Sequence, residues 1–274
     1  MSTSILDKAT HFRALHTGRR AFVIPNPWDG GSARLLESLG FRALATSSAA
    51  AAATLGRRDY GITRAEALAM ARVIADATDL PVSADLENGF GDAPEFVAET
   101  VRLAGEAGLA GCSIEDATGD DAHPLYDLGQ AVERVAAAAE AARALPFPFV
   151  FTARAEGLLH ERPDLDDVIV RLQAYERAGA DVLFAPGVKT LAEVRAVCTA
   201  VTKPVNFMNG MKGATFAVAE LEAAGARRIS LAASLYRAAM TGLRDAAREV
   251  AESGTFAFAG RVMTSAELQP ILRG

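Results

Sequence analysis

Hydrophobic residues of the chain gather in eight short runs, separated by longer stretches rich in alanine and glutamate. Several runs are apolar at nearly every position rather than at alternate positions, a pattern typical of parallel strands that are covered on both faces. The stretches between them favour helices, as do the alanine runs at 49–53 and 136–142. The eight predicted strands are 21–26, 43–48, 81–87, 111–116, 149–156, 182–187, 204–209 and 228–234.

Glycine or proline stands before most of the predicted strands. Four glycines lie where a helix would end in the left-handed conformation, and two prolines open strands. Eight strand–helix units favour an α/β fold of the (β/α)₈ TIM-barrel type, with an open doubly wound sheet as the alternative. These residues are Gly40, Gly108, Gly179, Gly225, Pro81 and Pro204.

The length of 274 residues fits one such barrel with a modest extension. No linker rich in Pro, Gly or Ser divides the chain, so we expect a single domain over 1–274. After the eighth strand the sequence has room for a helix, a turn at Gly254 and a further terminal helix. We therefore predict a C-terminal helical extension over 240–274.

Composition narrows the class of partner. The net charge is −6 and no run of Lys or Arg occurs, which argues against nucleic acid and anionic membranes as partners. The N-terminus lacks the apolar core of a signal peptide, and no stretch resembles a membrane span. Cys112 and Cys198 have spacing for neither a disulfide framework nor a zinc site. We expect a cytoplasmic protein that binds a small carboxylate metabolite.

Polar residues end most of the predicted strands, where a barrel carries its active site. Asp85, Glu87 and Glu115 follow neighbouring strands, so their carboxylates would repel one another without a cation. Oxygen ligands without nearby thiol or imidazole suit Mg²⁺. Alternatively, each acid caps a helix or pairs with Arg154 or Arg58; three together favour the metal.

Other strand-end residues are candidates for substrate binding. Ser47 and Ser48 open an alanine-rich helix and would either bind a substrate carboxylate or cap the helix. Arg154 would reach into the barrel mouth to meet carboxylates, or form an ion pair with Glu115 or Glu156. Trp28 would wall the mouth or pack beneath its loop.

Five motifs resemble, in order, those of the isocitrate lyase/phosphoenolpyruvate mutase superfamily, over residues 21 to about 240. They are NPWDGGSARLLESLGFRALATSS, GRRDYG, PVSADLENGFGD, AGLAGCSIEDATG and FTARAEG. The resemblance implies Mg²⁺, with Mn²⁺ as a substitute, closest to Asp85 and with its waters held by Glu87 and Glu115. It implies a carboxylate clamp at Ser47 and Ser48, a metal-shell or substrate acid at Asp59, and substrate contacts from Arg154, Glu156 and Asn206.

The resemblance also implies chemistry through an enolate or a related carbanion stabilised by the metal. The superfamily contains C–C lyases of small acids, an oxaloacetate decarboxylase and enzymes of phosphonates. Its methylisocitrate lyases carry K-K-C-G-H after the fourth strand and its mutases carry lysine and asparagine, whereas this chain has DATGDDAHPLYDLGQ at 116–130. Superfamily barrels pair through an exchanged C-terminal helix, which implies a homodimer or homotetramer.

We therefore expect a Mg²⁺-dependent lyase that cleaves a C–C bond of a small 2-oxo or hydroxy di- or tricarboxylic acid. A phosphonate C–P mutase or hydrolase, or a non-catalytic metabolite-binding relic, are the alternatives. Residues 117–130 are predicted to form a mobile lid that carries His123 and Tyr126, one of which replaces the missing cysteine as proton donor. His123 is favoured because its ordinary pKa of about 6.5 suits this work.

Overall fold

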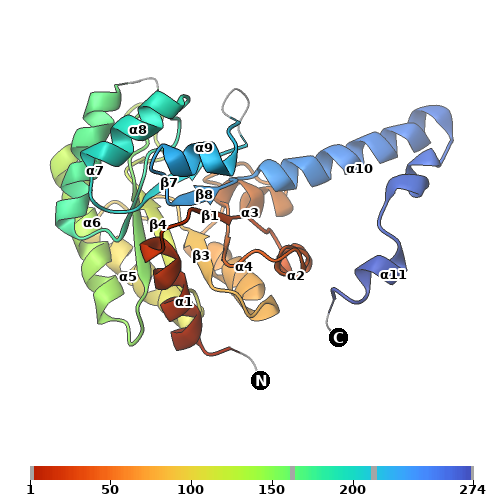
Figure 1. Ribbon diagram of the computed structural model, residues 1–274, viewed down its shortest axis with the longest axis horizontal. Coiled ribbons are helices and arrows are strands. Elements are labelled where there is room, and N and C mark those ends of the chain that lie inside the picture. The colour runs from red at the N-terminus through yellow and green to blue at the C-terminus, as the bar shows by residue number, and fades with distance from the viewer. Residues whose placement is uncertain (1–2, 161–163, 211–214, 273–274) are drawn as a thin grey trace.

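The computed structural model describes residues 3–160, 164–210 and 215–272, and it contains eight parallel strands (Figure 1). Each predicted run contains one strand, so the predicted α/β barrel is confirmed. Neighbours in the sheet follow the order β1-β8-β7-β6-β5-β4-β3-β2, which leaves β1 and β2 facing each other. The strands are β1 (Phe22–Ile24), β2 (Leu44–Ala45), β3 (Val82–Asp85), β4 (Gly111–Glu115), β5 (Val150–Arg154), β6 (Val182–Phe184), β7 (Val205–Met208) and β8 (Arg228–Ser230).

The seam between β1 and β2 is closed largely by one side chain. The Ala45 N–H donates to the Pro25 carbonyl at 3.0 Å. Next to it, the Asn26 amide donates to the Thr46 carbonyl at 2.8 Å and accepts from the Leu231 N–H at 2.9 Å. Asn26 therefore joins β1 to the ends of β2 and β8, which makes the sheet a nearly closed barrel.

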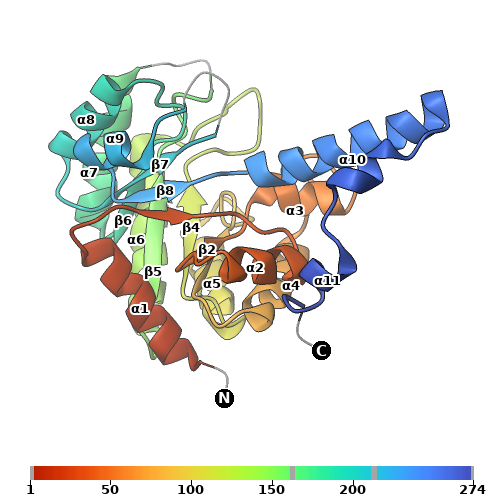
Figure 2. The same ribbon diagram turned by 45° about the vertical axis from the view of Figure 1, so that its right-hand side comes forward.

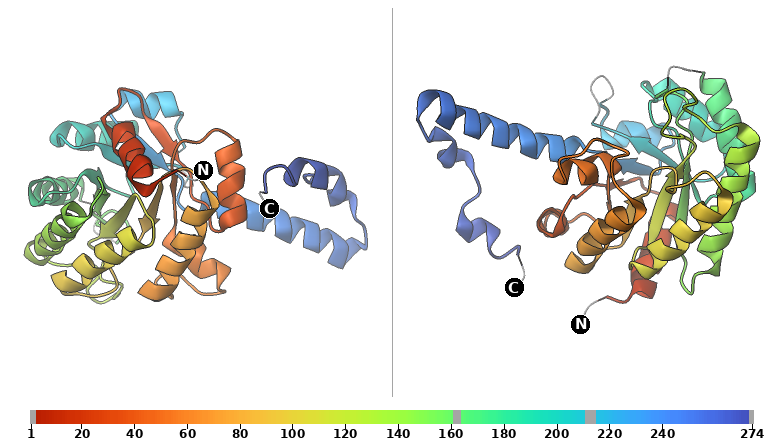
Figure 3. Two further views of the ribbon diagram at one scale, coloured as in Figure 1. Left: turned by 90° about the horizontal axis from the view of Figure 1, so that it is seen from below. Right: turned by 180° about the vertical axis from the view of Figure 1, so that it is seen from behind.

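Helices surround the barrel on its outer face (Figure 3). The glycines predicted to end helices at 40, 108, 179 and 225 all have φ between 81° and 109°, which confirms that prediction. The helices of this layer are α2 (Gly30–Ser38), α3 (Ser48–Thr54), α4 (Arg64–Ala77), α5 (Pro94–Glu106), α6 (Leu128–Ala144), α7 (Leu165–Ala178), α8 (Leu191–Ala200) and α9 (Val218–Ala223).

The N-terminal helix α1 (Ile5–Thr17) covers the end of the barrel where the strands begin. Its buried Phe12 and Leu15 pack with Phe22, Val150 and Val182, which lie at the starts of their strands. This end of the barrel is therefore filled with apolar side chains. The active site of a barrel of this kind lies at the opposite end, where the strands finish.

The C-terminal segment leaves the barrel. Helix α10 (Ser234–Ser253) projects away from it, and the chain turns at Gly254 before the short helices η1 (Ala257–Arg261) and α11 (Ser265–Leu268) (Figures 1 and 2). None of the residues of α10 is buried, and Met240, Leu243 and Val250 are exposed. In the part of the chain that the structure describes, no helix has the length and apolar character of a membrane span.

Candidate active site

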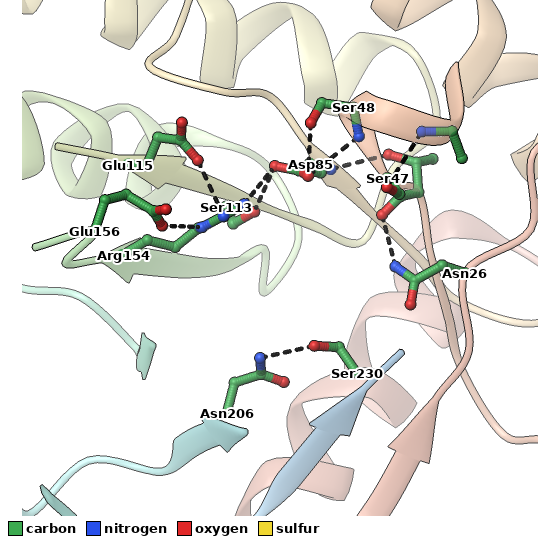
Figure 4. A network of polar contacts seen from close by, with 12 residues as sticks. Asn26, Ser47, Ser48, Asp85, Ser113, Glu115, Arg154, Glu156, Asn206 and Ser230 are labelled. Carbon is green, nitrogen blue, oxygen red and sulfur yellow. Dashed lines mark hydrogen bonds and ion pairs between the residues drawn. The ribbon is translucent and has the colours of Figure 1, made fainter. Parts of the chain in front are cut away.

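A single arginine joins three carboxylates where β3, β4 and β5 end (Figure 4). Arg154 contacts Asp85 through Nη1 at 2.8 Å, Glu115 through Nη2 at 3.2 Å and Glu156 through Nε at 2.8 Å. The strand register explains the arrangement, because Arg154 lies opposite Glu115 on β4, and Asp85 of β3 lies opposite Ser113 of β4. Burial alone would lower the pKa of Arg154, but Glu115, Glu156 and Asp85 raise it well above its usual value. The predicted convergence of strand-end charges is thus found in the structure.

The two serines predicted as a clamp for a substrate carboxylate lie at the start of α3. Ser48 donates to Asp85 Oδ2 from its N–H at 3.1 Å and from its hydroxyl at 3.2 Å. Ser47 accepts a hydrogen bond from the Ala50 N–H at 3.4 Å, which makes it the helix N-cap. The carboxylate that this helix start binds here is the protein's own Asp85.

Glu87 is the least satisfied acid of the site. It is 4% exposed, has φ of 49°, and its Oε1 has no hydrogen-bond partner among the described residues. Burial, followed by the charges of Asp85 and Asp59, raises its pKa to about 8. Asp59 has more of its surface exposed, but burial of its carboxyl and the charge of Asp85 raise its pKa as well. Negative charge at the mouth therefore exceeds what Arg154 neutralises.

That excess fits a cation. Within the described ranges no three acid, His or Cys side chains are arranged to bind one metal ion together. The carboxylate oxygens of the mouth suit a hard ion of the Mg²⁺ type, which keeps several waters when protein carboxylates bind it. The orphaned oxygen of Glu87 is the observation that supports this fit.

Asp116 follows Glu115 in the sequence, but its side chain faces helix α7 rather than the mouth of the barrel. Its Oδ1 accepts the Glu156 N–H at 2.7 Å, while its Oδ2 accepts from Arg171 at 3.1 Å and the Tyr175 hydroxyl at 2.6 Å. Because successive side chains of a strand point to opposite faces, Asp116 turns toward α7 when Glu115 faces the barrel. It is a buried support for the end of β5.

The structure does not bring the two predicted proton donors of the loop to this cluster. The His123 side chain is 86% exposed, with its Nδ1 3.6 Å from Asp120 Oδ2. Tyr126 is buried and donates to Asp92 Oδ1 at 2.6 Å, while Arg134 lies 4.1 Å from its ring centre. Burial and the bond to Asp92 raise the pKa of Tyr126 to about 12.

The loop that carries these donors has internal structure. Ala117 and Leu125 form an antiparallel bridge, and the Thr118 N–H donates to the Pro124 carbonyl at 3.0 Å. The segment predicted as a lid, 117–130, includes residues that belong to a helix, because α6 begins at Leu128. Closure of the remaining loop stays a prediction.

Sequence reasoning missed Tyr60. Its hydroxyl donates to Glu115 Oε1, and its φ of 59° is unusual for a residue with a side chain. A Cβ on Gly119 would lie 3.2 Å from the Tyr60 ring, so a glycine there allows the loop after β4 to approach the ring closely. The only sequence signal was its position directly after Asp59 in GRRDYG. Trp28, by contrast, packs edge-on against Tyr236, with the two ring centroids 5.5 Å apart, and it lines a small pocket together with Ser48.

On the opposite wall of the mouth, the polar contacts of the described residues involve no acid. Asn206 donates to the Ser230 hydroxyl at 3.0 Å (Figure 4). Its Oδ1 accepts from Arg228 Nε at 2.9 Å, and Arg228 Nη1 donates to Thr152 at 3.1 Å. Sequence reasoning also missed Arg228, although it interrupts an apolar strand as Arg154 does.

Comparison with known proteins agrees with this geometry. Residues 12–251 match the phosphoenolpyruvate phosphomutase family. A protein of Corynebacterium glutamicum named probable 2-methylisocitrate lyase 2 is 31% identical over 84% of this chain and 76% of its own length. A crystal structure of a Burkholderia cenocepacia J2315 protein, named only as a lyase/mutase, is 51% identical with a TM-score of 0.96, over 98% of this chain and 97% of that one.

A further structural neighbour is a 2,3-dimethylmalate lyase, named as a member of the PEP mutase/isocitrate lyase superfamily. It is 29% identical with a TM-score of 0.87, and the match covers 100% of this chain and 96% of that one. The resemblance drawn from the five motifs is confirmed, and the chain belongs to the phosphoenolpyruvate phosphomutase family of the isocitrate lyase/PEP mutase enzyme superfamily.

Proposed function

We propose that this enzyme is a lyase that uses Mg²⁺ to cleave a C–C bond of a small 2-oxo or hydroxy di- or tricarboxylic acid. The observation that carries the proposal is the group of acids around Arg154. Within it, the buried Glu87 keeps one oxygen without a hydrogen-bond partner among the described residues. The names of the relatives, lyases of 2-methylisocitrate and 2,3-dimethylmalate, support the reaction class.

In this proposal Asp85 holds the cation, and Glu87, Glu115 and Asp59 bind its waters. When bound, Mg²⁺ or Mn²⁺ stabilises the negative charge of an enolate as a Lewis acid. Arg154 neutralises a carboxylate of the substrate, for which its planar fork is suited. The N–H groups at Ser47 and Ser48 would bind a substrate carboxylate if Asp85, which Ser48 contacts here, were instead engaged by the cation.

Two side chains compete for the role of proton donor. His123 would have to move from solvent into the mouth by closure of the loop after β4. Tyr60 already contacts Glu115, and its ring lies against Gly119 of that loop. The geometry favours Tyr60 as the group that replaces the missing cysteine.

The family match makes C–P chemistry on a phosphonate the second candidate. A transferring phosphoryl group needs positive charge around it. The loop after β4 supplies Asp120 and Asp121 at the corresponding place, with neither Lys nor Arg between 116 and 130. The C–C lyase therefore remains our first proposal.

The test is a panel of acids with the purified protein and Mg²⁺: oxaloacetate, 2,3-dimethylmalate, 2-methylisocitrate and phosphonopyruvate. Pyruvate formed from a carbon acid, and abolished by EDTA, supports the lyase. Phosphate released from phosphonopyruvate supports the second candidate. Tight oxalate binding without turnover of any acid would indicate a non-catalytic metabolite-binding relic.

We also propose that α10 packs against a second copy of the chain, in a cytoplasmic homodimer or homotetramer. Its exposed apolar side chains include Met240 and Leu243, and the isolated chain buries none of the helix. Light scattering after size exclusion should give a multiple of 28.7 kDa, and Leu243→Asp should lower the mass. A monomeric wild-type protein at high concentration contradicts this proposal.

A further inference from the structure

A charged side chain lies inside the barrel below the acids of the mouth. Arg228, at the start of β8, is 5% exposed. Its guanidinium donates to two neutral groups, the Asn206 amide oxygen and the Thr152 hydroxyl. Among the described residues no carboxylate forms an ion pair with Arg228, whereas Arg154 has three such partners.

The charges nearest to Arg228 do not compensate it. Burial, followed by the charge of Arg154, lowers the pKa of Arg228 to about 9, so the group remains protonated at neutral pH. Burial, followed by the charge of Arg228, lowers the pKa of His16 to about 3, so this histidine is neutral. A buried charge without a counterion is destabilising by several kcal/mol, on the order seen for broken buried ion pairs. The fold retains this charge without a carboxylate counterion in the part of the chain that the structure describes.

Arg228 also lines a cavity. The cavity has a volume of about 70 Å³, which is room for a small oxyanion or a few waters. Its wall contains both arginines together with hydroxyl and amide groups, and it also contains Asp85, which is paired with Arg154. The polar residues that line it beside Asp85 include Arg154, Arg228, Ser83, Ser113, Asn206 and Ser230. Two guanidinium groups with hydroxyl and amide donors are the chemistry that binds a carboxylate.

We propose that this cavity is an anion subsite, in which Arg228 binds a carboxylate of a small dicarboxylate from the side opposite the acids of β3 and β4. That the dicarboxylate is the substrate rests on the proposed function, but binding of the anion does not. The subsite makes Arg228 a specificity residue, which selects acids that carry a second carboxylate over those with an apolar end in its place.

The probe is malonate, titrated into the intact protein by calorimetry in EDTA with ionic strength held constant by NaCl. Wild type should bind malonate and show a higher Tm with it, while neutral malonamide should do neither. Arg228→Met should weaken malonate binding by about tenfold or more, the scale of a lost charged hydrogen bond, and Arg228→Lys should weaken it less. Arg227→Met is the matched control, since the Arg227 side chain donates to the Arg19 carbonyl and lies outside the cavity lining.

Equal malonate affinity in wild type and Arg228→Met overturns the subsite, as does an equal loss in Arg227→Met. If Arg228→Met does not fold, Arg228→Gln takes its place in the same comparison. Malonate binding that depends on Arg228, without turnover of any acid in the panel, supports the subsite and contradicts the proposed lyase function. Turnover with unchanged malonate binding in the variant supports the lyase and removes the subsite.

Discussion

The two walls of the barrel mouth differ in the sign of the charge that their polar contacts leave uncompensated. On the β3–β5 wall, three carboxylates surround one arginine, and further acids are left over. On the β7–β8 wall, Arg228 is surrounded by an amide and a hydroxyl. Among the described residues, the first wall thus carries more negative than positive charge, and the second carries a positive charge without a paired carboxylate. A cavity lined by residues of both walls lies between them. A ligand that combines a cation with a carboxylate anion supplies what each wall lacks.

This comparison explains why Arg154 and Arg228 should not respond alike to mutation. Arg154 is an internal counterion, so its removal leaves buried carboxylates unpaired. Arg228 has no carboxylate partner within the described ranges, so its main effect should appear when an anion binds. The predictions that follow test the acidic wall, from the largest expected effect to the smallest.

Arg154→Met should have the largest effect, because Asp85, Glu115 and Glu156 lose their shared partner. Breaking a buried ion pair by removing one member costs about 3–5 kcal/mol. Urea unfolding should show a loss of that order, together with loss of turnover. Arg154→Lys, which keeps the charge but not the fork, should retain most of the stability and lose about tenfold or more in kcat/KM. Equal stability of Arg154→Met and wild type would contradict the role of internal counterion.

Asp85→Asn should abolish Mg²⁺-dependent oxalate binding, because the variant loses a charged ligand of the metal. We expect the affinity for oxalate to fall by about a hundredfold or more. The fold should remain, because asparagine can still accept from Ser48 and circular dichroism should be unchanged. If oxalate bound equally well to this variant, or to wild type in EDTA, the metal would lie elsewhere.

Tyr60→Phe and His123→Ala form a matched pair that separates the two candidate proton donors. Removal of the true donor should lower kcat by roughly 10²–10⁴ with little change in KM, and remove one limb of the pH–rate profile. We expect this from Tyr60→Phe, because its hydroxyl already lies at Glu115. A wild-type kcat in Tyr60→Phe with a large loss in His123→Ala would reverse the assignment.

Glu87→Gln should have the smallest effect, seen in the pH dependence of metal-free stability. The pKa of Glu87 is raised to about 8 in the fold from a usual 4.5, so the folded state keeps a proton that the unfolded chain releases. Stability is therefore lost as the pH rises from about 5 to 8. Glutamine does not titrate, so urea unfolding at pH 5.5 and 8 should show the variant losing on the order of 2–3 kcal/mol less. Parallel losses would show that Glu87 is ionised throughout.

The barrel was predictable from the sequence because its signals are local. A strand such as 149–156 carries its apolar run within itself, and Gly179 marks a helix end by its own conformational freedom. Arg154 could be singled out because a charge inside an apolar strand is conspicuous. These inferences needed no knowledge of distant contacts.

Residues whose roles depend on facing or on distant contacts could not be predicted in the same way. Glu115 and Asp116 are adjacent acids, and only the strand register decides which faces the barrel. Arg227 and Arg228 present the same ambiguity. Tyr60 meets Glu115 across 55 positions of sequence, a contact that composition and spacing cannot show.

The seam at Asn26 has a consequence for how the barrel opens. Elsewhere neighbouring strands exchange ladder hydrogen bonds, but β1 and β2 meet through the Ala45 N–H and the side chain of Asn26. Local opening follows the path with the fewest bonds to break, so amide hydrogens beside this seam should exchange with solvent before those of β4 and β5. The Leu231 N–H, which donates to the Asn26 side-chain oxygen, would report that opening directly. Local opening of the barrel would then occur at the β1–β2 seam rather than around its whole circumference.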